Sequence, residues 1–147
     1  MPILTQAQGA RSAAVLTAGT LVSAGYIAGS VIDLGAAIPL DVTFELEFTP
    51  NALPSSTSKQ CVLFLKMSLD GTNYSTGPES GTTATDDGQL FFIGSLPSSV
   101  SGQVVRKQFS IAGQPVARYL KPILKNDLGV ALTSGFVYKA DITGVST

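Results

Sequence analysis

The chain has 147 residues, with ten acidic side chains, nine basic side chains, one cysteine and no histidine. This length suits one domain with a single hydrophobic core. The basic residues are scattered and form no run of the kind that contacts nucleic acid, and no apolar stretch reaches the roughly 20 residues that span a bilayer. We therefore expect neither a nucleic acid nor a membrane as a partner.

The composition argues against the common kinds of catalytic site. Without histidine, the Ser-His and Cys-His nucleophile pairs and the commonest metal ligand are missing. One cysteine cannot form an intrachain disulfide or hold a structural zinc ion, and Cys61 lies in an apolar strand pattern that favours a small buried side chain. We expect a protein that is not an enzyme and has no cofactor, assembled in a reducing cytoplasm.

The first residues differ in pattern from the rest of the chain. Residues 1–11 show no clear hydrophobic period and suggest an extended arm, while 12–18 form a weak candidate strand. We expect an N-terminal arm over residues 1–20 and a β-sandwich domain over residues 21–147.

The remaining chain alternates between strand patterns and turn residues. Alternation is clearest in 41–49, where Val42, Phe44, Leu46 and Phe48 point one way and polar residues the other. The candidate strands are 12–18, 24–33, 41–49, 60–69, 89–96, 103–111, 116–125 and 135–143. About eight strands without helical periodicity predict an all-β, antiparallel two-sheet sandwich of the jelly-roll type.

The stretch 60–69 is predicted to be a central strand. Its apolar face comprises Cys61, Leu63, Leu65, Met67 and Leu69. The other face carries Lys66 and Ser68, with Val62 and Phe64 covering its first half. Residues 70–73, with the sequence DGTN, tolerate positive φ and predict a tight turn directly after the strand. Pro122, which has no backbone N–H, predicts an edge or a bulge in the strand 116–125.

Strand 89–96 is apolar on both sides over residues 90–93. This pattern predicts a strand buried on both faces, against the core and against another layer or subunit.

Acidic residues offer the remaining candidates for chemistry. Glu45 and Glu47 share the polar face of one strand, whereas a glycosidase needs carboxylates that face each other across a cleft. In the longest loop, 76–88, the pair Asp86 and Asp87 would need Glu79 or Asp70 to complete a calcium site. An ordinary solvent-facing strand and an ordinary acidic loop are the simpler interpretations, and no metal site is predicted.

Aromatic and basic residues allow further surfaces. Tyr74, beside the predicted turn, is the best candidate among the four tyrosines for a sugar platform, although packing or an interface is the simpler role. Five basic residues would form one mildly basic area if their strands were neighbours, but solvated strand faces are the simpler explanation. These residues are Arg106, Lys107, Arg118, Lys121 and Lys125.

Two resemblances connect these motifs to known families. SLDGTNYS at 68–75 with ARYLKPILKND at 117–127 resembles the turn and Arg-Tyr strand of discoidin-like and carbohydrate-binding jelly rolls, with Tyr74 where those proteins have tryptophan. The segments at 31–50, 68–78, 92–97 and 119–132 resemble small structural proteins of tailed bacteriophages. These segments are VIDLGAAIPLDVTFELEFTP, SLDGTNYSTGP, FIGSLP and YLKPILKNDLGVAL.

The phage resemblance implies a virion protein of the capsid decoration, or cement, type. It implies binding to the major capsid protein or another virion protein and self-association, with a trimer favoured. The alternative is a tail or baseplate component that binds a host-surface glycan. The expected interface consists of the arm, the loops 50–58 and 76–88, and seven residues. These residues are Ile3, Leu4, Arg11, Tyr74, Glu79, Asp86 and Asp87.

Overall fold

A computed structural model describes residues 4–82, 86–111 and 117–146. Within these ranges the chain forms ten strands and one short 3-10 turn, η1 (Asp87–Gln89). The strands are β1 (Leu4–Gln8), β2 (Leu16–Thr17), β3 (Tyr26–Ala28), β4 (Ile32–Asp33), β5 (Asp41–Pro50), β6 (Gln60–Ser68), β7 (Phe91–Pro97), β8 (Val105–Ser110), β9 (Tyr119–Asp127) and β10 (Leu132–Ser146).

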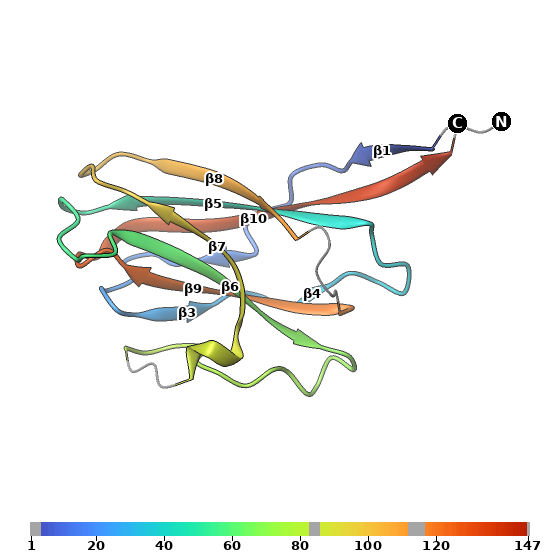
Figure 1. Cartoon of the computed structure of the whole chain (residues 1–147), viewed down its shortest axis with the longest axis horizontal. Coiled ribbons are helices and arrows are strands. Elements are labelled where there is room, and N and C mark those ends of the chain that lie inside the picture. The colour runs from blue at the N-terminus through green and yellow to red at the C-terminus, as the bar shows by residue number, and fades with distance from the viewer. Residues whose placement is uncertain (1–3, 83–85, 112–116, 147) are drawn as a thin grey trace.

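The strands form two antiparallel sheets packed face to face (Figure 1). Sheet A has the order β1-β10-β5-β8, with β2 also paired to β10, and sheet B has the order β3-β9-β6-β7, with β4 also paired to β9. The strands pair in a nested order, in which β2 pairs with β10, β3 with β9, β5 with β8 and β6 with β7. The first of these pairs joins strands near the two ends of the chain, and each following pair lies further towards the middle of the sequence. This nested pairing is the jelly-roll arrangement of two Greek keys, so the predicted β-sandwich is confirmed.

The core lies between the two sheets. Strand β5 alternates strictly between half-buried and fully buried residues, and it directs Val42, Phe44, Leu46 and Phe48 inwards. Sheet B contributes Cys61, Leu63 and Leu65 from β6, together with Leu120 and Leu124 from β9. Burial raises the pKa of the Cys61 thiol, so this side chain stays protonated and packs as a small apolar group.

Strand β6 lies between β7 and β9, so its predicted central place in a sheet is confirmed. The predicted C-terminal end of this strand is wrong. Leu69 was expected on the buried face, whereas the strand stops at Ser68 and the Leu69 side chain is 88% exposed. The Ser68 hydroxyl accepts hydrogen bonds from the backbone N–H groups of Asp70 and Gly71, at 3.3 and 2.9 Å. The turn therefore begins one residue earlier than the alternation suggests.

The predicted strand 24–33 is divided into β3 and β4. Gly29 lies in the break, where an added Cβ would collide with the backbone oxygen of Val15. Its N–H donates to the carbonyl of Pro122 at 2.8 Å. The side of Pro122 that lacks an N–H donor therefore faces the interruption between β3 and β4. This explains how a proline is accommodated in β9.

Strand β7 also departs from its prediction. It starts at Phe91, after η1, and Phe92 is 59% exposed, so no other layer of this chain buries the second face over residues 90–93. Burial of that face against another subunit stays a prediction. A register shift between Leu63 and Phe64 marks a bulge in the β6–β7 ladder. Bulges change which side chains point inwards, and simple alternation cannot locate them.

The N-terminal residues are tied to β10. Strand β2 pairs with it, and Leu16 and Ala18 belong to the core, so the boundary placed at residue 20 lies within the packed part of the chain. Residues 1–11 were expected to lack a strand pattern, yet Leu4–Gln8 pairs with the end of β10. Figure 1 shows this two-stranded ribbon projecting away from the sandwich.

Candidate functional site

A long connection covers the outer face of sheet B. It runs from Leu69 to Leu90, of which residues 83–85 lie outside the described ranges, and we call it the strap. Figure 1 shows it passing along the side of sheet B that faces away from sheet A. Leu90 packs there in a second apolar cluster with Val62, Phe64 and Ile123. The strap is therefore a packed layer of the fold.

Two acidic side chains of the strap, Glu79 and Asp87, bind lysines of sheet B. Glu79 Oε1 accepts hydrogen bonds from Lys66 Nζ at 3.2 Å and Lys121 Nζ at 3.0 Å. Asp87 Oδ2 accepts from Tyr26 OH at 3.0 Å and Lys125 Nζ at 3.3 Å. The Lys66 residue is only 6% exposed, so Glu79 compensates a charge that is largely removed from water.

These contacts keep both carboxylates ionised. The hydrogen bond from Lys121, and then the one from Lys66, lower the pKa of Glu79 although partial burial opposes them. The hydrogen bonds from Tyr26 and Lys125 lower the pKa of Asp87 in the same way. Both groups form part of an internal ionic network, whereas Asp86 beside them is exposed.

The three acidic residues of the loop therefore do not converge on a common point suited to an ion. Among the residues that the structure describes, no group of three histidine, cysteine or acidic side chains is close enough to hold a metal ion. Asp70, the other suggested ligand, uses its carboxylate within its own turn.

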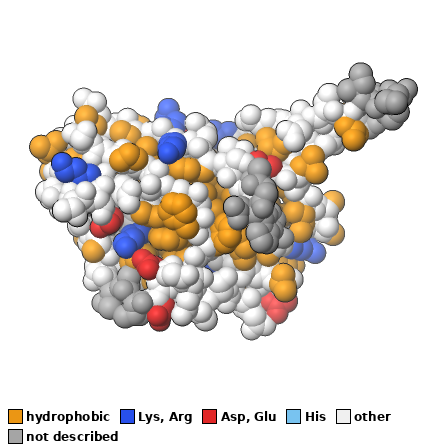
Figure 2. Space-filling view, in the orientation of Figure 1, with side chains coloured by type: hydrophobic (Ala, Val, Ile, Leu, Met, Phe, Trp, Pro, Cys, Tyr) orange, Lys and Arg blue, Asp and Glu red, His pale blue; other side chains and the backbone are white. Residues whose placement is uncertain are grey.

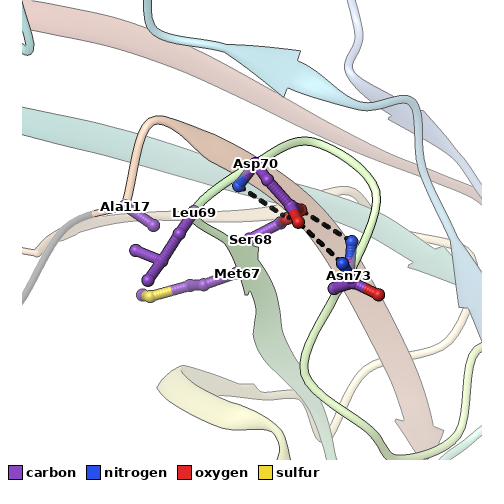
Figure 3. Close-up of a pocket in the computed structure, with 6 residues that line it drawn as sticks. All are labelled: Met67, Ser68, Leu69, Asp70, Asn73 and Ala117. Carbon is purple, nitrogen blue, oxygen red and sulfur yellow. Dashed lines mark hydrogen bonds between the residues drawn. The ribbon is translucent and has the colours of Figure 1, made fainter.

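That turn lines a shallow pocket at one end of the sandwich (Figure 3). Asp70 Oδ1 accepts from the backbone N–H groups of Thr72 at 2.9 Å and Asn73 at 2.8 Å, which lowers the pKa of Asp70. Met67, Leu69 and Ala117 form the apolar side of the pocket. Its volume of about 240 Å³ is below the range of typical small-molecule sites.

Tyr74 is less available than its position suggested. It is half-buried, and Lys121 Nζ lies 4.6 Å from the centre of its ring. The same lysine binds Glu79, so the ring belongs to the contact between strap and sheet. A sugar platform needs an open aromatic face, and Lys121 occupies part of this one.

The outer face of sheet A carries a second polar network. Glu45 binds Arg11 at 2.5 Å and Gln108 at 2.7 Å, and Glu47 binds Arg106 at 2.5 Å. Partial burial raises the pKa of Glu45, but the hydrogen bonds from Gln108 and Arg11 outweigh it and the net pKa is lowered. A glycosidase acid needs a raised pKa, which Glu45 does not have.

Arg11 anchors the segment that follows the ribbon. Besides Glu45, its guanidinium lies over the ring of Tyr138, 3.4 Å from the ring centre. The N-terminal segment is thereby held on the outer face of sheet A before it reaches β2. Of the expected arm residues, Arg11 makes internal contacts, Leu4 is 80% exposed in the ribbon, and Ile3 lies outside the described residues.

The ribbon is the most exposed element of regular structure. Residues 4, 5, 6 and 8 of β1 are all exposed, as are 143–145 of β10. Figure 2 shows the ribbon standing clear of the body, with apolar side chains among neutral ones along it. A two-stranded ribbon has little stability of its own in water.

The five basic residues proposed as one area are distributed over both sheets. Arg106 and Lys107 belong to β8 in sheet A, whereas Lys121 and Lys125 belong to β9 in sheet B. The lysine cluster that does form includes Lys66, which the sequence placed on the face of 60–69 opposite the main apolar face. Its position next to Val62 and Phe64, on a face with apolar residues, was the available signal that this lysine is covered.

Comparison with known proteins finds no family model that matches the chain and no curated protein that matches its sequence. No helix in the described part of the chain is long and apolar enough to cross a membrane.

Proposed function

We propose that the protein is a non-enzymatic structural component of a bacteriophage virion, which decorates the capsid by binding the major capsid protein and neighbouring copies of itself. The observation that carries this proposal is the ribbon of β1 and the end of β10. It projects from a closed sandwich and exposes neutral and apolar side chains. The proposal of a virion as the setting rests on the resemblance of residues 31–50, 68–78, 92–97 and 119–132 to structural proteins of tailed bacteriophages.

The rest of the molecule suits such a role. Both outer faces of the sandwich are occupied by internal networks, the strap on sheet B and the Arg11 cluster on sheet A. A rigid body of this kind holds a projecting element in a fixed direction. Addition of a ribbon strand to a neighbouring subunit would provide backbone hydrogen bonds without needing charge.

A tail or baseplate component that binds a host glycan is the second candidate. One observation favours it, namely the pocket beside the turn 70–73, which has an apolar side and exposed polar residues at the end of the sandwich. The carboxylate of Asp70 is already bonded within the turn, and Tyr74 is partly covered. We therefore rank this candidate below capsid decoration.

Binding to capsids assembled from the major capsid protein alone tests the proposal. We expect deletion of residues 1–8, which removes β1 and keeps Arg11, to abolish co-sedimentation. Leu4→Asp should weaken binding by about tenfold or more, equivalent to about 1.4 kcal/mol. Leu69→Asp is the matched control, because both leucines are highly exposed and Leu69 lies beside the pocket instead.

Undiminished capsid binding by the deletion variant would contradict the role of the ribbon. Two results together would favour the tail component. The intact protein would bind a glycan array but no capsid, and Leu69→Asp would lose the glycan binding.

A further inference from the structure

The outer edge of β1 carries backbone groups with no partner strand. In an antiparallel ladder, alternate residues direct both their N–H and C=O groups at the neighbouring strand. The N–H of Gly9 donates to the carbonyl of Asp141 at 2.8 Å, and the same register continues through Ala7 and Thr5. By this alternation Leu4, Gln6 and Gln8 point their backbone groups away from β10. No strand among the described residues pairs with that side of β1.

The other outer strands of the two sheets carry features that discourage pairing. Natural edge strands are protected by charge, bulges, proline or short length. Strand β8 carries Arg106 and Lys107, and β7 has a bulge opposite Leu63 and ends at Pro97. Strands β2, β3 and β4 are short, with two, three and two residues. Strand β1, with the sequence LTQAQ, has five residues and none of these features. Its outer edge is therefore suited to accepting a strand.

We propose that β1 pairs edge to edge with β1 of a second copy of this chain, antiparallel about a twofold axis. An interface of this kind is self-complementary, because each strand offers the other the same groups. Centring the axis on Gln6 places Gln6 opposite its counterpart and Leu4 opposite Gln8. Three outward-facing residues from each copy then form up to about six backbone hydrogen bonds.

The chemistry of β1 favours a second copy over a charged partner. The segment from Leu4 to Gln8 has no ionisable side chain, so two copies approach without like-charge repulsion. The two Gln6 side chains would lie side by side, where each amide can donate to the other. Because the ribbon projects beyond the sandwich, the two strands can meet while the bodies remain apart (Figure 1).

The β1–β1 pairing would supply the contact between neighbouring copies that the proposed function includes. It rests on that function only for its setting in a virus particle. The β1–β1 pairing is complete in a dimer, since it uses the one free edge of β1 in each copy. The trimer that the phage resemblance implies would require a different contact. The oligomeric state of the purified protein therefore separates the two arrangements.

A charge exchange at Gln6 tests the pairing directly. Light scattering of the intact protein should show a dimer that dissociates on dilution. Gln6→Lys and Gln6→Glu, each alone, should be monomeric at concentrations about tenfold above the dissociation constant of the intact protein, because like charges face each other across the axis. A one-to-one mixture of the two variants should restore the dimer. Gln103→Lys and Gln103→Glu serve as controls at an exposed glutamine outside β1 and should remain dimeric.

A monomeric or trimeric intact protein would overturn the inference, as would a dimer that survives both substitutions at Gln6. Capsid binding is measured separately. A dimer that depends on Gln6 but binds no capsid would support the pairing and contradict the capsid role, whereas a monomer that binds capsids through the ribbon would do the reverse.

Discussion

At the scale of single residues, side chains at equivalent positions of the sequence pattern differ in their solvent exposure. Leu63 and Leu69 share a face in a strict period-2 pattern, yet Leu63 is fully buried and Leu69 is 88% exposed. The difference arises at Ser68, whose hydroxyl binds the backbone of the following turn and ends the strand. The free energy of unfolding should depend on these two leucines very differently.

We expect Leu63→Ala to lower the free energy of unfolding by about 2–5 kcal/mol, because it removes buried methyl groups and leaves a cavity between the sheets. Leu69→Ala, the matched control, should change it by less than about 0.5 kcal/mol. Urea denaturation of the two variants measures both values. Equal losses of stability would mean that β6 continues through Leu69 and that the turn is misplaced.

At the scale of elements, the strap is held by both apolar and ionic contacts. Leu90 supplies the apolar contact, while Glu79 and Asp87 bind the lysines of sheet B. The backbone of the strap also accepts a hydrogen bond at Gly81 from the N–H of Tyr26, at 2.7 Å. The attachment of the strap should therefore depend on pH through its carboxylates.

The sign of this dependence follows from Glu79. Its pKa is lower in the folded protein than in the unfolded chain, so its contribution is complete above the unfolded value of about 4.3. The contribution is lost as the pH falls through the lowered folded value. Glu79→Gln should cost about 1–2 kcal/mol at pH 7, since the side chain is 42% exposed but its partner Lys66 is buried.

Urea denaturation of the intact protein and of Glu79→Gln at a series of pH values measures this contribution. The difference between the two should shrink steadily below about pH 4. Asp86→Asn, which alters an exposed carboxylate next to Asp87, should leave the stability nearly unchanged at every pH. A Glu79→Gln penalty that stayed constant down to pH 2 would show that the ion pairs do not hold the strap.

The elements also show what sequence patterns can and cannot determine. Alternation in 41–49 correctly predicts the buried face of β5, since each inward position depends only on local geometry. The lysine contacts of the strap could not be predicted, because Glu79 and Lys121 are brought together by tertiary folding across 42 positions. The pairing of β1 with β10 likewise joins the two ends of the chain, and LTQAQ has no apolar alternation to reveal it.

At the scale of the whole molecule, the nested strand pairing explains where the ribbon lies. Strand β10 has fifteen residues, and its end extends past the sandwich with β1 beside it. The two sheets enclose the core and carry internal networks on their outer faces. The ribbon is an exposed element that is available to a neighbouring subunit, and this availability is the basis of the proposed capsid role.

A search for this protein in phage particles tests that proposed role most directly. Electron cryo-microscopy of virions, with and without the protein, should reveal the sandwich as added density on the outer surface of the capsid, with the ribbon against an adjacent subunit. Density at the tail or baseplate, or a virion that contains none of this protein, would contradict the account.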